Sequence, residues 1–228
     1  RGTRTPFVAG PNDDGRPVWS PDGKRVAYFS CCEDVSALHV KGVNDTGKGQ
    51  VPIKEQYFNP PTDWSEDGRF ILYEYRSDLW VMPIAEDGKP YPLMQTQSIE
   101  SQGVFSPDLH WVAFVSDETG HEEIYVMSFE HPGEKWRVSS AGGNDPRWRH
   151  DGRELFYLAS DNHLMSVEFK PGSEFAAGVP AALFKTDPLA ADFDPTADGQ
   201  RFVFVVSAPG VQRLPFAVNL DWMKDLKR

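Results

Sequence analysis

Seven polar side chains lie in the short segments that precede a repeated turn motif, and their types suit binding rather than bond-making chemistry. They are Arg16, Asp63, Gln102, Asp145, Arg147, Asp192 and Asp194. Carboxylates and guanidinium groups hold polar groups of a ligand when they converge in a concave site. The sequence leaves a second interpretation open, in which these charges only pair with one another across a water-filled channel.

The patterns that mark common catalytic centres are absent. A serine hydrolase of the α/β type needs Gly-x-Ser-x-Gly at a strand-to-helix turn, and the nearest candidate, Ser140, lacks the first glycine. A zinc peptidase needs His-Glu-x-x-His, and His121 has no second histidine at that spacing. The sequence therefore predicts no catalytic residues.

No cofactor or metal site is predicted. Calcium needs six to eight oxygen ligands, whereas the acidic pairs Asp13-Asp14, Asp117-Glu118 and Glu122-Glu123 lie apart on predicted loops. Gly142-Gly143 lacks the lysine of a phosphate-binding loop and is interpreted as a turn. The adjacent Cys31-Cys32 is interpreted as two ordinary thiols, because pairing adjacent cysteines closes a strained ring; a disulfide or redox role is the alternative.

A turn motif recurs five times and positions the polar segments. Its first copy is Trp19-Ser20-Pro21-Asp22-Gly23, followed by an apolar strand at Arg25–Ser30. Proline presets the backbone of such a turn, aspartate bonds its own backbone, and glycine accepts a positive φ. Measured at the corner glycine or its equivalent, the copies lie at residues 23, 68, 109, 152 and 199, so the steps are 45, 41, 43 and 47 residues. Strand-rich units of this length are typical of four-stranded propeller blades.

We therefore predict an all-β fold, a β-propeller of five four-stranded blades that forms one domain over residues 1–228. The repeats are 9–54, 55–96, 97–140, 141–186, and 187–222 together with 3–8. Each begins with a short inner strand that ends at the corner, such as Pro17–Trp19, and the run Gly10–Gly15 is expected to be a turn. Trp19, Trp64 and Trp148 share one repeat position, which favours packing between blades over a sugar-binding platform.

The two ends of the chain are expected to complete each other. The fifth repeat lacks a fourth strand and its third is Pro215–Leu220, while Thr3–Val8 is a surplus strand at the start. Pairing of Thr3–Val8 into the last blade would close the ring and remove unpaired edges. The alternative is a fragment of a six- or seven-bladed propeller.

The composition and net charge of the chain limit the classes of partner that it is expected to bind. The 228 residues are 39% hydrophobic and 13% aromatic, enough for a folded core, and the formal net charge is −11. Nucleic acid and anionic membranes attract basic surfaces, so neither is expected as a partner. No apolar stretch approaches the roughly 20 residues of a membrane-spanning helix, and Arg1 begins no signal peptide.

The repeated corners resemble the TolB-type propeller repeat, in which an aromatic residue and Ser-Pro-Asp-Gly precede an apolar strand. Residues 19–28 match that pattern in full, and the likeness extends over nearly the whole chain. Departures are Glu66 for proline, Leu109-His110 after Asp108, Arg149-His150 for Ser-Pro, and the degenerate fifth copy. They are expected to affect turn details more than architecture.

A narrower likeness is to the C-terminal propeller of acidobacterial-type membrane serine/threonine kinases. The residues that carry it are 58–64, 145–149, 154–158 and 218–228. The resemblance implies a sensor or interaction domain in the periplasm or outside the cell, and it supplies no catalytic residues to transfer.

The predicted function is that of a non-catalytic module that binds a protein or peptide at the mouth of its axial channel, where the seven polar residues lie. One alternative is the substrate-gating propeller of a prolyl-oligopeptidase-like hydrolase. Another is a lyase or hydrolase that works within the funnel, which would need clustered acids or histidines there.

Overall fold

The computed structural model describes residues 7–8, 13–32, 35–47, 49–55, 60–85 and 87–206, and within them it contains strands and no helix. Sheet 1 contains β1 (Asp13–Trp19), β2 (Arg25–Cys32), β3 (Val35–Gly42) and β4 (Gln50–Glu55). Sheet 2 contains β5 (Pro61–Trp64), β6 (Phe70–Tyr75), β7 (Asp78–Pro83) and β8 (Tyr91–Pro92). Sheet 3 contains β9 (Glu100–Phe105), β10 (Trp111–Ser116), β11 (Glu123–Ser128) and β12 (Lys135–Arg137). Sheet 4 contains β13 (Asn144–Trp148), β14 (Glu154–Leu158), β15 (His163–Glu168) and β16 (Ala181–Lys185), and sheet 5 contains β17 (Ala190–Pro195) and β18 (Phe202–Val206).

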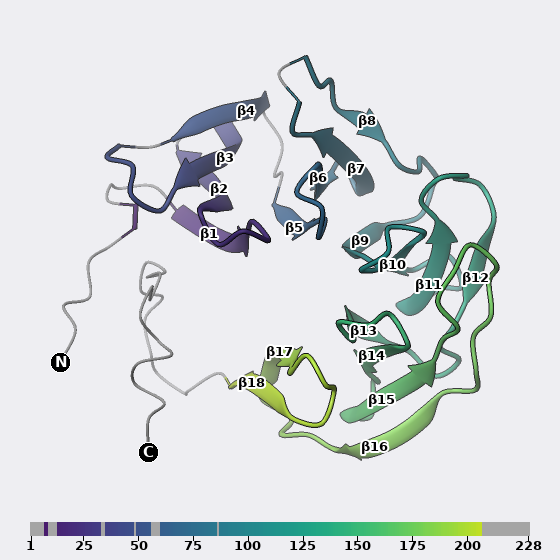
Figure 1. Cartoon of the computed structure of the whole chain (residues 1–228). Coiled ribbons are helices and arrows are strands. Elements are labelled where there is room, and N and C mark those ends of the chain that lie inside the picture. Colours follow the sequence, from purple (N-terminus) through teal and green to yellow (C-terminus); the bar gives the residue numbers. More distant parts are fainter. Residues whose placement is uncertain are drawn as a thin grey trace, which may run out of the picture.

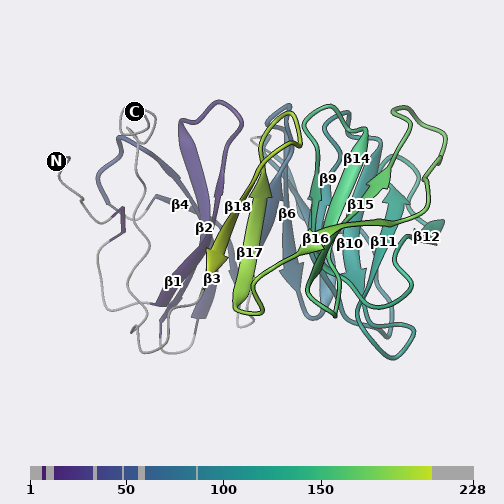
Figure 2. The same cartoon turned by 90° about the horizontal axis from the view of Figure 1, so that it is seen from below.

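The five sheets follow one another around a common axis, with the first strand of each sheet innermost (Figure 1). In the perpendicular view, strands such as β9, β10 and β17 run along this axis (Figure 2). Neighbouring strands within each sheet are antiparallel and consecutive in sequence. This is the radial arrangement that the repeat spacing predicts.

The repeated corner is held by one serine and one aspartate. In sheet 3, Ser106 Oγ donates to Asp108 Oδ1 at 2.6 Å and accepts the Trp111 N–H at 2.9 Å, while Asp108 Oδ1 accepts the His110 N–H at 3.2 Å. The same contacts recur in the corners of sheets 1, 2 and 5, with threonine in place of serine in sheet 5. Since the side chains satisfy backbone groups that the turn leaves unpaired, the motif fixes the angle between the first two strands.

In the described residues the core consists of four apolar clusters, each at the junction of two consecutive sheets. Sheets 1 and 2 meet through residues such as Leu38 and Ile71, and sheets 2 and 3 through Leu79 and Phe114. The remaining two clusters join sheets 3 and 4, and sheets 4 and 5. Strand β10 is buried on both faces, because sheet 3 packs against sheet 2 on one side and sheet 4 on the other.

Glycines allow the closest approach between sheets. A Cβ atom on Gly103 of β9 would lie 2.9 Å from Leu79 Cδ1 of sheet 2, and one on Gly143, just before β13 of sheet 4, would lie 2.9 Å from Ile124 Cγ1 of sheet 3. Real Cβ atoms do not approach other heavy atoms that closely, so larger side chains here would push the strands apart.

Several predictions for the ends need correction or lie beyond the described residues. Phe7 and Val8, the described end of the predicted strand Thr3–Val8, lie in a bend, and the Phe7 ring packs against Tyr28 of sheet 1 at 6.2 Å between centroids. The predicted strand Pro215–Leu220 falls outside the described residues. Within the described residues no strand pairs sheet 1 with sheet 5, so neither five complete blades nor closure of the ring is confirmed.

The inner strands are longer than predicted. β1 begins at Asp13 rather than at Pro17, so it takes in part of the run Gly10–Gly15 that was expected to be a turn. The tryptophans that share one repeat position were predicted to pack between blades. This prediction is confirmed for Trp64, which is buried, and is wrong for Trp19, which is 41% exposed. Trp64 lies at the junction of sheets 1 and 2, whereas Trp19 is on the face of sheet 1 that has no described sheet beside it.

Candidate functional site

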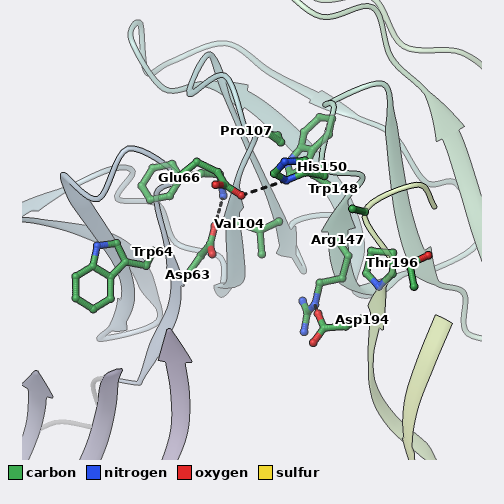
Figure 3. A pocket seen from close by; sticks show the side chains of 13 residues that line it. Asp63, Trp64, Glu66, Val104, Pro107, Arg147, Trp148, His150, Asp194 and Thr196 are labelled. Carbon is green, nitrogen blue, oxygen red and sulfur yellow. Dashed lines mark hydrogen bonds and ion pairs between the residues drawn. The ribbon is translucent and has the colours of Figure 1, made fainter. Parts of the chain in front are cut away.

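The seven predicted residues line two recesses along the axis rather than one mouth. The bulge-end recess, of about 430 Å³, is lined by Arg16, Gln102, Asp145 and Asp192, and also by Glu74 and Arg147. The corner-end recess, of about 380 Å³, is lined by Asp63, Arg147 and Asp194, and also by Glu66 and His150 (Figure 3). Arg147 lines both recesses, so the two are linked through one side chain.

Backbone bulges in the inner strands turn side chains into the bulge-end recess. Arg16, Gln102 and Asp145 hold equivalent places in β1, β9 and β13, with φ angles of 52°, 53° and 50°. The strand register shifts at each of these places. A left-handed backbone costs a residue other than glycine about 1–3 kcal/mol and is common at functional sites, and a bulge re-aims the side chain that it carries.

Polar side chains also link neighbouring sheets at the axis. Glu74 Oε1 of sheet 2 accepts the Gln102 N–H at 2.9 Å, and Gln102 Oε1 accepts the Asp145 N–H of sheet 4 at 2.7 Å. Burial raises the pKa of the Glu74 and Asp145 carboxyls above their ordinary values. Gln102 therefore holds the inner strands together through its side chain as well as lining the recess.

Arg147 is the main cation of the axis. Its guanidinium donates to Asp192 Oδ1 at 2.7 Å and to the Pro146 carbonyl at 2.9 Å, and lies 3.5 Å from Asp194 Oδ1. Pairing between charges across the axis, the second interpretation of the sequence, is thus part of what these residues do. Asp192 and Asp194 are 53% and 85% exposed in their side chains, so the partners of Arg147 are open to exchange with a ligand.

Asp63 is a carboxyl whose protonation changes near neutral pH. Its Oδ2 accepts the Phe105 N–H of sheet 3 at 2.7 Å. Burial raises its pKa to about 7, although the Phe105 and Trp64 amides and the positive charge of Arg147 oppose the rise. A group of this kind both donates and accepts hydrogen bonds around pH 7.

The prediction missed Glu66 and His150, which meet over the corner-end recess. They hold the corner position that is proline in Pro21 and Pro107, and His150 Nδ1 lies 3.6 Å from Glu66 Oε1 (Figure 3). They belong to sheets 2 and 4, which are separated in sequence by the whole of sheet 3. Their departure from the repeat was visible in the sequence, and only the ring arrangement shows that both departures face the same recess.

Comparison of the sequence with protein families identifies the family of the chain. Residues 15–179 match the TolB beta propeller domain family. The chain belongs to this family.

Within the described residues, no cluster of three or more histidine, cysteine, aspartate or glutamate side chains is arranged to hold a metal ion. No helix in that part of the chain has the length and apolar character to span a membrane.

Solved structures show the same fold at low sequence identity. TolB from Acinetobacter baumannii matches with a TM-score of 0.71 and 18% identity over 89% of this chain, and this chain spans 51% of the length of that one. A protein assigned as TolB from Agrobacterium tumefaciens matches with a TM-score of 0.56 and 18% identity, over 78% of this chain and 83% of that one. The β-propeller domain of Cps50 (Swd1) from Myceliophteria thermophila matches with a TM-score of 0.55 and 13% identity, over 75% and 58%. The chain thus spans about half the length of the Acinetobacter TolB.

Proposed function

We propose that this TolB-family propeller is a non-catalytic module that binds a protein or peptide through its two axial recesses. One observation carries the proposal. Asp63, Arg147 and Asp194 stand at the inner-strand position that is Val18 in sheet 1 and Val104 in sheet 3. Charged residues stand at places that face the axis, where sheets 1 and 3 carry valine and packing alone would favour an apolar residue.

The size and chemistry of the recesses suit the side chains of a peptide. Each has a volume of about 400 Å³, which fits one or two side chains and excludes a folded domain. Arg147 and its carboxylate partners offer both signs of charge, and the Trp148 and Val104 side chains add apolar wall. Rigid strands carry these groups, so binding orders few of the protein's own side chains.

Arg147→Ala is expected to weaken peptide binding about ten-fold or more, because it removes the one cation that lines both recesses and leaves Asp192 and Asp194 without it. The probe is a random-peptide library displayed on phage and selected on the immobilised wild-type protein, followed by affinity measurements on the enriched peptides. Arg153→Ala is the matched control, since Arg153 carries the same charge on sheet 4 but its side chain is 67% exposed away from the recesses.

Two results would contradict the proposed function. The first is that selection enriches no peptide. The second is that enriched peptides bind Arg147→Ala as tightly as the wild type while circular dichroism shows both proteins folded.

We further propose that the module is the extracytoplasmic sensor part of a membrane serine/threonine kinase. Support comes from the likeness of residues 58–64, 145–149, 154–158 and 218–228 to kinase-linked propellers. The sequence of the complete gene product tests this proposal. A kinase domain and a membrane helix before residue 1 are expected, and an α/β-hydrolase domain after residue 228 would contradict it.

A further inference from the structure

A recess beside the outer strands of sheets 3 and 4, the outer recess, has aromatic walls and lies apart from the axis. Its volume is about 610 Å³, and its walls include Trp111 of β10, Trp136 of β12 and Phe175. β12 is the outermost strand of sheet 3 (Figure 1). None of the seven polar residues at the axis lines the outer recess. It is therefore a second surface, which the proposed axial function does not use.

The outer recess is built by a connection of sheet 4 that folds over sheet 3. Residues 169–180 join β15 to β16, whereas the equivalent connection of sheet 3 is the shorter segment 129–134. Two groups of sheet 3 hold Gly172 in the longer connection. Its carbonyl accepts the Trp111 indole N–H at 2.7 Å, and its N–H donates to Asp108 Oδ2 at 3.4 Å. The extra length of this connection thus forms a wall that is anchored to the neighbouring sheet.

The three aromatic rings of the outer recess hold one another in place. Trp136 and Phe175 stack with 4.3 Å between ring centroids and 8° between ring planes. Trp111 meets both rings edge-on at 5.7 Å and is only 4% exposed, whereas Trp136 and Phe175 are partly exposed. The rings therefore offer apolar surface and partly negative ring faces that need little further ordering when a ligand binds.

Two carboxylates give the outer recess a negative charge that no neighbouring cation balances. Glu134 and Glu174 line the recess, and both are exposed. Among the described residues that line it there is no lysine or arginine. Lys135, which follows Glu134 in the sequence, pairs with Glu118 instead. Since ring faces and carboxylates both attract positive charge, the recess is complementary to a cation.

We propose that the outer recess binds an organic cation whose charged end is an alkylated ammonium group, as in choline. Methyl groups on the nitrogen surround the charge with apolar surface, which suits contact with the Trp136 and Phe175 rings. A bare ammonium group is strongly hydrated and would lose more on leaving water. Glu134 and Glu174 supply the opposite charge at the edge of the recess.

Titration of the wild-type protein with three matched probes tests this proposal. Choline, its neutral isostere 3,3-dimethyl-1-butanol and ammonium chloride are each added at millimolar concentrations, and the indole N–H resonances of Trp111 and Trp136 are followed by NMR. Choline is expected to bind about five-fold or more tightly than the isostere, which lacks the charge, and than ammonium, which lacks the methyl groups. Failure of choline to bind, or equal binding of choline and either other probe, would overturn the proposal.

Vesicles of phosphatidylcholine distinguish a free ligand from a lipid headgroup. Sedimentation of the protein with the vesicles, suppressed by free choline, would identify a headgroup as the source of the alkylated ammonium group. Choline binding without sedimentation would identify a small soluble ligand. Both results support the proposed chemistry of the outer recess.

Variants then assign the binding to the residues of the recess. Glu134→Gln combined with Glu174→Gln is expected to weaken choline binding about five-fold, because the charge is removed while the rings stay in place. Trp136→Leu, which keeps an apolar side chain and removes the ring, is expected to weaken it by a similar factor. Glu130→Gln is the matched control, since Glu130 lies in the same connection as Glu134 but does not line the recess. Unchanged choline affinity in the double carboxylate variant, or an equal loss in the control, would overturn the proposal.

Discussion

Asp63→Asn is expected to stabilise the protein by about 2–4 kcal/mol at pH 8 and to have little effect near pH 4. Burial raises the pKa of Asp63 from 3.8 to about 7 in the folded state. Between pH 3.8 and about pH 7 the folded protein holds a proton on Asp63 that the unfolded chain has released. The wild type therefore loses stability as the pH rises through about 7. Asparagine resembles the protonated acid and still accepts the Phe105 N–H, so the variant escapes that loss.

Urea unfolding at pH 4.5 and at pH 8 measures the effect. Asp151→Asn is a control of opposite sign, because Arg149 lowers the pKa of Asp151 to about 2. The stability that Asp151 contributes is present above about pH 4 and disappears as the pH falls toward 2, so its removal is expected to destabilise the protein at pH 8. If Asp63→Asn destabilised the protein at pH 8, or changed its stability equally at both pH values, the conclusion that burial raises the pKa of Asp63 would be wrong.

Phe114→Ala is expected to cost about 3–5 kcal/mol of unfolding free energy. The Phe114 side chain is fully buried at the junction of sheets 2 and 3 and stacks on Tyr125 at 5.8 Å between ring centroids. Its removal leaves a cavity that neither sheet can fill, because each is also packed against another neighbour. Thermal or urea unfolding of the variant measures the loss.

Val179→Ala serves as the apolar control, since Val179 is 89% exposed in the connection before β16. A change within about 0.5 kcal/mol is expected there. A loss of unfolding free energy below about 1 kcal/mol for Phe114→Ala would contradict the conclusion that this junction is a tightly packed part of the core.

The sequence predicts the sheets well because one corner chemistry repeats in it. Ser106 and Asp108 make the same turn contacts as their counterparts in sheets 1, 2 and 5, so a pattern of residue types specifies a pattern of hydrogen bonds. The apolar strands after each corner pack on both faces in a radial array. These features are local, or repeat at a fixed period, and a single sequence carries both.

The inner strands could not be predicted as well, because their bulges have no residue signature. Arg16, Gln102 and Asp145 adopt a left-handed backbone that glycine and asparagine usually take. An arginine or a glutamine in the sequence does not predict a left-handed backbone. The register shift therefore becomes visible only when the partner strand is in place, and β1 extends through residues that resemble a turn.

The sequence did not predict that the polar residues along the axis line two separate recesses. Each of the seven polar residues lines a recess, and the split into two recesses depends on positions two residues apart along the inner strands. Glu66 and His150 were seen only as departures from the repeat. Their meeting depends on the curvature of the whole array, which no local pattern contains.

The repeats stand around one axis, so side chains from sheets 2 and 4 meet across it. Glu66→Cys with His150→Cys, treated with a short bis-maleimide reagent, tests it most directly, because the native side chains are 3.6 Å apart although they belong to sheets that are not neighbours. We expect an efficient intramolecular cross-link between residues 66 and 150, and little between Glu66→Cys and Lys170→Cys. Lys170 follows β15, the third strand of sheet 4, whereas His150 follows β13, the innermost strand of that sheet (Figure 1). Equal cross-linking of the two pairs, or none between residues 66 and 150 in a folded protein, would contradict the radial arrangement and the axial recesses with it.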